Sequence, residues 1–159
     1  MAETPWEALV QDLRDALDLA RVTHVLLRLL VAAALGGLLG YQRESVGKSA
    51  GMRTYMLVTV GAAFFVIVPQ LEGMQHDAMS RVLQGLITGI GFLGGGAILK
   101  LTSEKEVLGL TTAAGIWLAA AIGIATGLGR VGTALLGTML AYGILSVVYH
   151  WEQRMTHKP

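Results

Sequence analysis

The chain contains no cysteine among its 159 residues, and charged side chains make up only 14% of it. The lack of cysteine excludes disulfide bonds and thiolate metal sites. The charged fraction is well below the roughly 25% of ordinary soluble domains. Lysine and arginine number 12 and aspartate and glutamate 11, so the net charge of +1 gives no reason to expect a nucleic acid partner.

Catalytic motifs are also missing from the sequence, which has no HExxH, no P-loop and no GxSxG. The Gly-Ile-Gly at residues 89–91 lacks the preceding strand and the acidic residue of a dinucleotide-binding fingerprint. The histidines are scattered, at His24, His76, His150 and His157. We therefore expect a protein that is not an enzyme and carries no cofactor.

What the sequence has instead is a series of long apolar stretches. They cover residues 22–39, 52–68, 81–99, 107–125 and 131–148. Each has 17 to 19 residues, close to the roughly 20 that a helix needs to cross a bilayer's hydrocarbon core. The pattern predicts an all-α fold, a polytopic transmembrane helical bundle of about five spans. We assign residues 22–150 to this bundle and 151–159 to a short cytoplasmic tail.

Residues 1–21 predict an amphipathic helix lying at the membrane interface. Thr4, Pro5 and Glu7 form a capping-box pattern, and Trp6 suits an interface. An ordinary solvated helix packed on the bundle fits the same pattern. This first segment is acidic rather than basic, so we do not expect a signal peptide.

Glycine is abundant, and all 21 glycines lie between residues 36 and 143. Residues 81–99, RVLQGLITGIGFLGGGAIL, carry six of them. In lipid, small residues let two helix backbones approach closely. We therefore expect residues 81–99 to be the central packing helix. We expect helix contacts at four glycine pairs: Gly36 and Gly40, Gly85 and Gly89, Gly91 and Gly95, and Gly123 and Gly127.

The distribution of lysine and arginine predicts an orientation. With five spans, one side of the membrane carries seven of these residues and the other carries four. The positive-inside rule places the richer side in the cytoplasm. We therefore expect a multi-pass inner-membrane protein with its N-terminus outside and its C-terminus in the cytoplasm. The richer side holds Arg43, Lys48, Arg53, Lys100, Lys105, Arg154 and Lys158, and the other holds Arg14, Arg21, Arg81 and Arg130.

At the predicted cytoplasmic end, the topology gathers a first set of polar residues. Helix starts present unpaired N–H groups there, which would bind an anion or neutralise Glu44 within the protein. In the simpler alternative, Thr111 or Thr112 caps the fourth helix and Arg53 reaches lipid phosphate. The candidate residues are Arg43, Glu44, Arg53, Thr54, Thr111 and Thr112.

At the opposite end, Asp77, Arg81 and Gln84 follow one another at helical spacing. Asp77 would cap the third helix or pair with Arg81. The alternative is that Asp77 and Glu72 help to coordinate Mg²⁺, which prefers carboxylate oxygens. Arg28, inside the first span, either extends to the near interface or has a buried partner. The sequence does not identify a metal site.

Five strings occur in order: GLLGYQRES, AGMRTYMLVTVGAAFF, RVLQGLITGIGFLGGGAIL, GLTTAAGIW and AAIGIATGLG. Together they resemble the MgtC/SapB family of bacterial membrane proteins, over about residues 29–145. Gln42 and Tyr55 depart from the family pattern, which often has an acidic residue and a histidine there. Carried onto this chain, the family's motif positions are Arg43, Glu44, Arg53, Thr54, Asp77, Arg81, Gly91, Gly94, Thr111, Thr112 and Trp117.

The resemblance implies an inner-membrane protein linked to growth under magnesium limitation and to survival inside host cells. It also implies the rotary ATP synthase as a membrane partner. Larger members append an ACT-like domain after the membrane region. This chain ends before one would fit, so we expect regulation through that domain to be absent.

Two functions follow from these observations. The first is a non-enzymatic protein that acts through helix contacts with itself, as a homodimer, and with a membrane partner. The second is a transporter or channel for an ion or small solute, which requires a continuous polar path from Asp77 to Thr111. Membrane lipids surround the chain in either case.

Overall fold

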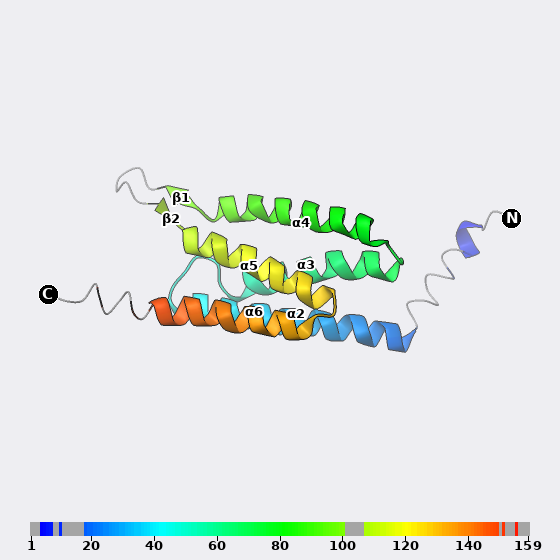
Figure 1. The fold of residues 1–159 in the computed structure, drawn as a ribbon, viewed down its shortest axis with the longest axis horizontal. Helices are drawn as coiled ribbons and strands as arrows, with labels where there is room; N and C mark the ends of the chain where they lie inside the picture. The colour runs from blue at the N-terminus through cyan, green and yellow to red at the C-terminus, as the bar shows by residue number, and fades with distance from the viewer. Residues whose placement is uncertain are drawn as a thin grey trace.

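A computed structural model describes residues 4–7, 10, 18–100, 107–149, 151 and 155. The predicted all-α bundle is confirmed, and its helices run along one long axis, with the start of α2 and the end of η1 at opposite ends of the bundle (Figure 1). Two antiparallel strands of two residues each lie between the third and the fourth helix of the bundle. The elements are α2 (Leu19–Ser45), α3 (Met52–Leu71), α4 (His76–Gly96), β1 (Leu99–Lys100), β2 (Val107–Leu108), α5 (Leu110–Gly127), α6 (Val131–Gly143) and the π-helical turn η1 (Ile144–Val148).

Four segments in the described part of the chain are long and apolar enough to cross a membrane: α2, α3, α5, and α6 together with η1. α4 is a further helix of the bundle, with 21 residues. Large apolar side chains cover the outside of the bundle, and Leu57 and Met139 are 72% and 69% exposed. Such exposure fits helices that face lipid rather than water.

The structure places the helix ends a few residues from the predicted positions. α2 begins at Leu19, three residues early, because Asp18 caps it by accepting bonds from the N–H groups of Ala20 and Arg21. α3 continues past Pro69 to Leu71, so the prediction that Pro69 ends this helix is wrong. Pro69 has no N–H to donate to the Phe65 carbonyl, but α3 continues for two residues beyond it.

The capping box at the N-terminus is confirmed. The Thr4 N–H donates to Glu7 Oε2 over 2.9 Å, and the Glu7 N–H donates to Thr4 Oγ1 over 3.3 Å. Hydrogen bonding with Thr4 lowers the pKa of the Glu7 carboxyl. The Thr4 backbone has the larger effect and the Thr4 side chain the smaller one. Most of the predicted amphipathic helix 1–21 and of the tail 151–159 lies outside the described residues, so both stay predictions.

α3 packs closely against both α2 and α5. Gly36 of α2 lies so near α3 that a Cβ there would stand 2.7 Å from the Tyr55 carbonyl oxygen. Gly40 comes equally close to Met52 and Gly51. The α5 side is similar: a Cβ on Gly123 would meet the Thr59 carbonyl oxygen, and one on Gly127 the Ala63 carbonyl oxygen. Two of the predicted glycine pairs thus lie at helix contacts.

The prediction that residues 81–99 form the central packing helix is wrong. α4 lies at the edge of the bundle, where it packs mainly on α5, and only Met79 and Gly94 of it are buried. No atom of another element lies within 4 Å of a Cβ built on any glycine of the other two predicted pairs, which are Gly85 and Gly89, and Gly91 and Gly95. These glycines therefore pack against nothing else in the described part of the chain.

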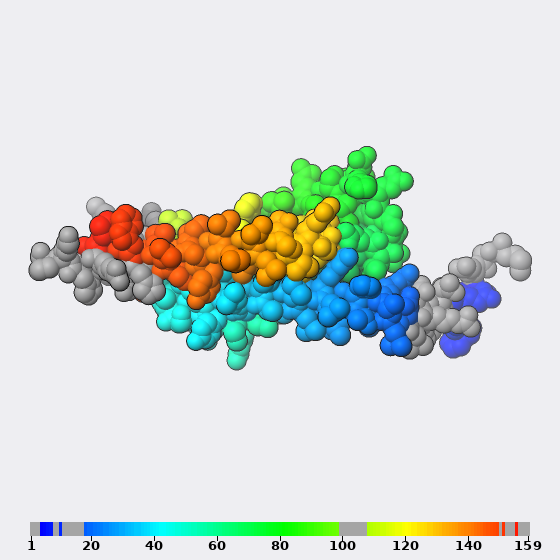
Figure 2. Space-filling view, turned by 60° about the horizontal axis from the view of Figure 1, so that its bottom comes forward, coloured from blue at the N-terminus to red at the C-terminus, as the bar shows by residue number. Residues whose placement is uncertain are grey.

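α2 and α6 lie side by side along most of the bundle and form the face in Figure 2. Ala134, Thr138 and Ala141 are buried on the inner side of α6. The outer side of α6 carries large exposed residues such as Leu136 and Met139. α4 stands on the other side of α5 from α6, so one of its flanks is open (Figure 1).

Candidate functional site

A buried arginine, for which the described residues supply no carboxylate partner, lies at the end of the bundle where α2 ends. Arg43 is only 2% exposed, although it carries a positive charge. Its Nη2 donates a long bond of 3.4 Å to the hydroxyl of Thr112 on α5, and its Nε has no acceptor. The last turn of α2 offers partial negative charge to a cation, but a buried charge is costly unless it is paired.

Two more buried side chains around Arg43 have unsatisfied polar atoms. The Tyr55 side chain is fully buried, and its hydroxyl lies against Gly115 of α5 without a hydrogen-bond partner. Gln42 donates from Nε2 to the Leu145 carbonyl in the π-helical turn over 3.0 Å, but its Oε1 has no partner. We call Gln42, Arg43, Tyr55 and Thr112 the Arg43 cluster.

Sequence reasoning did not name Gln42 or Tyr55 as candidate site residues. A signal for Gln42 was present, because it follows Leu35 and Leu39 at helical spacing on the buried face of α2. For Tyr55 the signal was weaker. Its burial depends on Gly115 of α5, a residue far away in the sequence that leaves room for the Tyr55 hydroxyl. Both residues became noticeable in the sequence only as departures from the resembled family.

The other candidates at this end lie outside the Arg43 cluster. Glu44 Oε2 accepts a bond from the Met52 N–H over 3.0 Å, so the start of α3 neutralises Glu44 rather than a free anion. Arg53, Thr54 and Thr111 are exposed. The predicted threonine cap of the fourth helix is wrong, because Gly109, with a φ of 92°, is the N-cap of α5. A Cβ at this position would meet the Ala97 carbonyl oxygen.

At the opposite end, Asp77, Arg81 and Gln84 are exposed on α4. The N-cap of α4 is Gln75, so the prediction that Asp77 caps this helix is wrong. Within the described residues, no three His, Cys, Asp or Glu side chains converge on a metal position. Because Mg²⁺ is often held by one or two carboxylates and water, the magnesium alternative for Glu72 and Asp77 stays a prediction.

Arg28 has neutral partners inside the bundle. Its Nη1 donates to Gln70 Oε1 over 3.0 Å and to the Gly127 carbonyl over 2.9 Å. Gly127 is the last residue of α5, where unpaired carbonyls carry partial negative charge. Arg28 is half-buried, and its partners are the amide oxygen of the exposed Gln70 and a backbone carbonyl rather than a buried acidic side chain.

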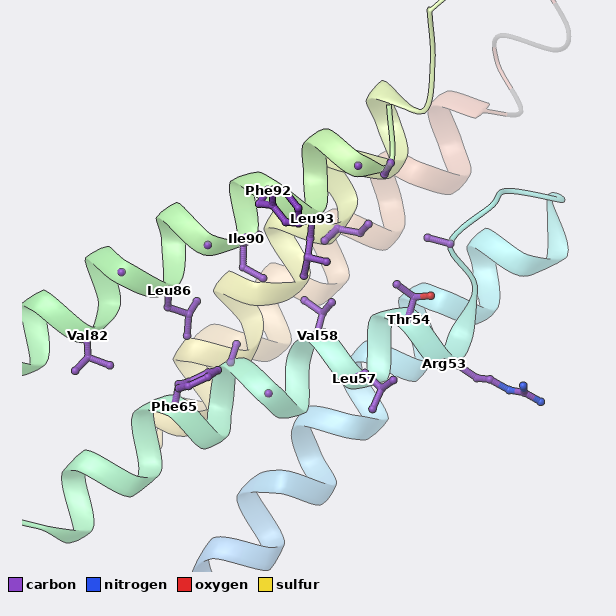
Figure 3. A pocket seen from close by; sticks show the side chains of 18 of the residues that line it. Arg53, Thr54, Leu57, Val58, Phe65, Val82, Leu86, Ile90, Phe92 and Leu93 are labelled. Carbon is purple, nitrogen blue, oxygen red and sulfur yellow. The ribbon is translucent and has the colours of Figure 1, made fainter. Parts of the chain in front are cut away.

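An apolar groove of about 1080 Å³ separates α3 from α4, and Ile116 of α5 lies at its base. In Figure 3, Leu86 and Ile90 of α4 point toward α3, whereas Arg53 points away from α4. Polar side chains stand only near the two ends of the groove, with Thr54 toward one end and Arg81 toward the other. The described residues therefore form no continuous polar path along it.

A stripe of residues at four-residue spacing runs along α4: Asp77, Arg81, Gly85 and Gly89, of which the last three line the groove. We call this stripe the α4 edge. Gly85 and Gly89 line the groove and touch no other element, and Phe92, one turn further along, is 85% exposed. A flat small-residue surface beside a large exposed aromatic ring is a typical contact surface for another transmembrane helix.

Comparison with known proteins gives a consistent set of relatives. A family profile described as "MgtC family" matches residues 29–154. Protein SrpB of Synechococcus elongatus is 44% identical over 130 residues, covering 75% of this chain and 71% of the relative. The putative magnesium transporter YhiD of Escherichia coli is 35% identical, and protein MgtC of Salmonella typhimurium is 36% identical. The alignments with these two cover 84% of this chain but only 64% and 56% of the relatives. No solved structure matches the chain.

Proposed function

The chain belongs to the MgtC family, and from this premise we propose that it is a non-enzymatic inner-membrane protein of adaptation to magnesium limitation that works as a homodimer. The α4 edge of one copy pairs with the α4 edge of the other. The observation that carries the proposal is the open side of α4. No atom of another described element lies within 4 Å of a Cβ built on Gly85 or Gly89.

The chemistry of the α4 edge supports a second copy as the occupant of this surface. Small residues four apart allow two copies of one helix to cross closely, and a two-fold interface uses the same surface on both copies. Asp77 and Arg81 have opposite charges one turn apart on α4. In a parallel two-fold pair, each of these charges would have both a like and an opposite charge of the other copy nearby, so the glycines and not the charges support the pairing.

The link to magnesium rests on family membership and on the name of one relative, the putative magnesium transporter YhiD. The rival function, transport through this chain, receives less support because the groove between Thr54 and Arg81 is apolar. Regulation of the ATP synthase, survival inside host cells and an N-terminus outside with a cytoplasmic C-terminus remain parts of the proposal. The start of α2 and the end of η1 lie at opposite ends of the bundle, which fits that orientation (Figure 1).

We expect the double substitution Gly85→Leu and Gly89→Leu to convert a detergent-solubilised dimer into a monomer, because two leucines would fill the groove edge and keep the helices apart. Size-exclusion chromatography with light scattering measures the change. The matched control is Gly91→Leu with Gly95→Leu, which adds the same side chains to α4 but does not touch the groove lining.

A dimer that persists in the Gly85→Leu, Gly89→Leu protein would contradict pairing through the α4 edge. A wild-type protein that is monomeric at every concentration would contradict homodimerisation altogether. If the monomeric wild type still needs Gly85 and Gly89 for growth in low magnesium, the occupant is a different transmembrane protein, such as the ATP synthase.

A further inference from the structure

The Arg43 cluster contains hydrogen-bond donors that the fold buries without supplying an acceptor. In the described part of the chain, the Nε of Arg43 and the hydroxyl of Tyr55 have no partner, and the two side chains are 2% and 0% exposed. Thr112 accepts the bond from Arg43 Nη2, which leaves its own hydroxyl hydrogen as a third donor. Buried donors are nearly always paired, so unpaired ones indicate that an ion or a water molecule completes the site.

These donors belong to three helices and meet on one face of α5. Arg43 of α2 is bonded to Thr112, and the hydroxyl of Tyr55 on α3 lies against Gly115, three residues further along α5. Residues three apart are neighbours on one helical face. The guanidinium and the Tyr55 hydroxyl are near enough to interact electrostatically, although no hydrogen bond joins them. The three donors are therefore gathered at one place between α2, α3 and α5.

The electrostatic environment of this place is positive. Arg43 is the one charged member of the cluster, and Glu44, the next residue, uses its Oε2 to accept a bond from the Met52 N–H. Thr112 lies in the first turn of α5, which none of the described side chains caps, so the positive end of this helix adds to the guanidinium. The last turn of α2 supplies only part of an opposite charge. Because a buried charge without a counterion is costly, the site favours an anion over water.

The site also restricts which anion fits. One guanidinium is balanced by one negative charge, so a divalent anion would leave an excess of charge in the interior. Arg43, Tyr55 and Thr112 are all buried and line no part of the groove, so the ligand has to be small. The free acceptor of the cluster, Gln42 Oε1, would repel an anion, but the Gln42 amide is bonded to Leu145 of η1 and not to α5.

From this geometry we propose that the Arg43 cluster binds a small monovalent anion of the size of chloride. Arg43 Nε and the hydroxyls of Tyr55 and Thr112 hold it. Arg43 lies in the last turn of α2, and the two hydroxyls lie in the first turns of α3 and α5, so a slight separation of the helix ends admits the ion from the aqueous side. The proposal does not depend on the pairing of α4 edges, because no member of the cluster lies on α4.

Thermal unfolding of the full-length chain in detergent tests this site. Sodium chloride replaces sodium gluconate at constant ionic strength, because gluconate is too large for an enclosed site. We expect the wild-type midpoint to rise with chloride and to level off, with a rise of about 3–6 °C when chloride is at ten times its dissociation constant. Arg43→Met should unfold at a higher temperature than the wild type in gluconate and show no saturable response to chloride.

Two further variants sharpen the test. Tyr55→Phe removes one oxygen atom and leaves the charge in place, so it should weaken chloride binding about tenfold, the effect of losing roughly one hydrogen bond to a charged group. Arg53→Met is the matched control, because Arg53 is exposed at the same end of the bundle. It should keep the full wild-type response to chloride.

A wild-type midpoint that does not depend on chloride would overturn the proposal and leave water as the partner of these donors. An equal response in the wild type and Arg43→Met would also overturn it, because the effect would then be a general effect of salt. If Arg43→Met does not fold, Tyr55→Phe carries the test, and an unchanged chloride affinity in that variant would overturn the assignment. Light scattering on the same samples measures dimerisation, so the two proposals can fail separately.

Discussion

A leucine in place of Gly123 is expected to abolish the folded protein. The Cβ of any larger residue would meet the Thr59 carbonyl oxygen and stand 2.8 Å from the Ala62 Cβ. These atoms belong to α3. One is a backbone oxygen and the other a Cβ, so neither can move by a change of rotamer, and α5 must separate from α3. Overpacking usually costs 1–3 kcal/mol, and for contact with a fixed backbone we expect at least about 3 kcal/mol. Thermal unfolding in detergent, followed by circular dichroism, measures the loss.

The control for this prediction is Gly132→Leu on α6, because nothing lies within 4 Å of a Cβ at that position. The two substitutions add the same side chain to a glycine of a transmembrane helix. A cooperative transition near the wild-type temperature for Gly132→Leu, and none for Gly123→Leu, would support close packing of α3 and α5. Equal stability of the two variants would show that the helices do not meet at Gly123.

Arg43→Met is expected to stabilise the protein. Arg43 has lost its hydration, and in exchange has only a 3.4 Å bond to Thr112 and an Nε without a partner. Replacing buried charges by apolar side chains of similar size is often worth 1–4 kcal/mol, so we expect a gain of about 1–4 kcal/mol in the free energy of unfolding. Unfolding in a series of denaturing detergent concentrations measures the gain.

Arg53→Met is the matched control, since Arg53 is exposed at the same end of the bundle. Its substitution should change the free energy of unfolding by no more than about 0.5 kcal/mol. A clear loss of stability in Arg43→Met would mean that the guanidinium has a strong partner. The Arg43 cluster would then be a satisfied structural network rather than a buried charge held at a cost.

The bundle could be predicted because apolar length depends on composition alone. Residues 52–68 and 131–148 are long and apolar whatever they contact, and both lie in membrane-length helices. The position of α4 could not be predicted this way. Glycine spacing indicates that a helix can be approached closely, but it does not say whether the neighbour belongs to the same chain. Gly123 has such a neighbour in α3, whereas Gly85 has none.

The candidate site was only partly predictable for a related reason. The sequence indicated that Arg43 and Thr112 lie at one end of the bundle, and the structure joins them. It also grouped Arg53 and Thr111 with them, although both face outward. Which of two neighbouring polar residues is buried depends on which face of their helix packs against the other helices. That face is fixed by contacts such as Gly115 against Tyr55, between residues far apart in the sequence.

The most direct test of pairing through the α4 edge uses the lack of cysteine in the natural sequence. A single cysteine at Gly89 forms a disulfide only if another copy places the same residue within about 4.5 Å between Cβ atoms. Mild oxidation of native membranes should therefore give a covalent dimer with Gly89→Cys and only monomer with Gly132→Cys on α6. Monomer from Gly89→Cys, together with a dimer from Gly132→Cys, would contradict the account.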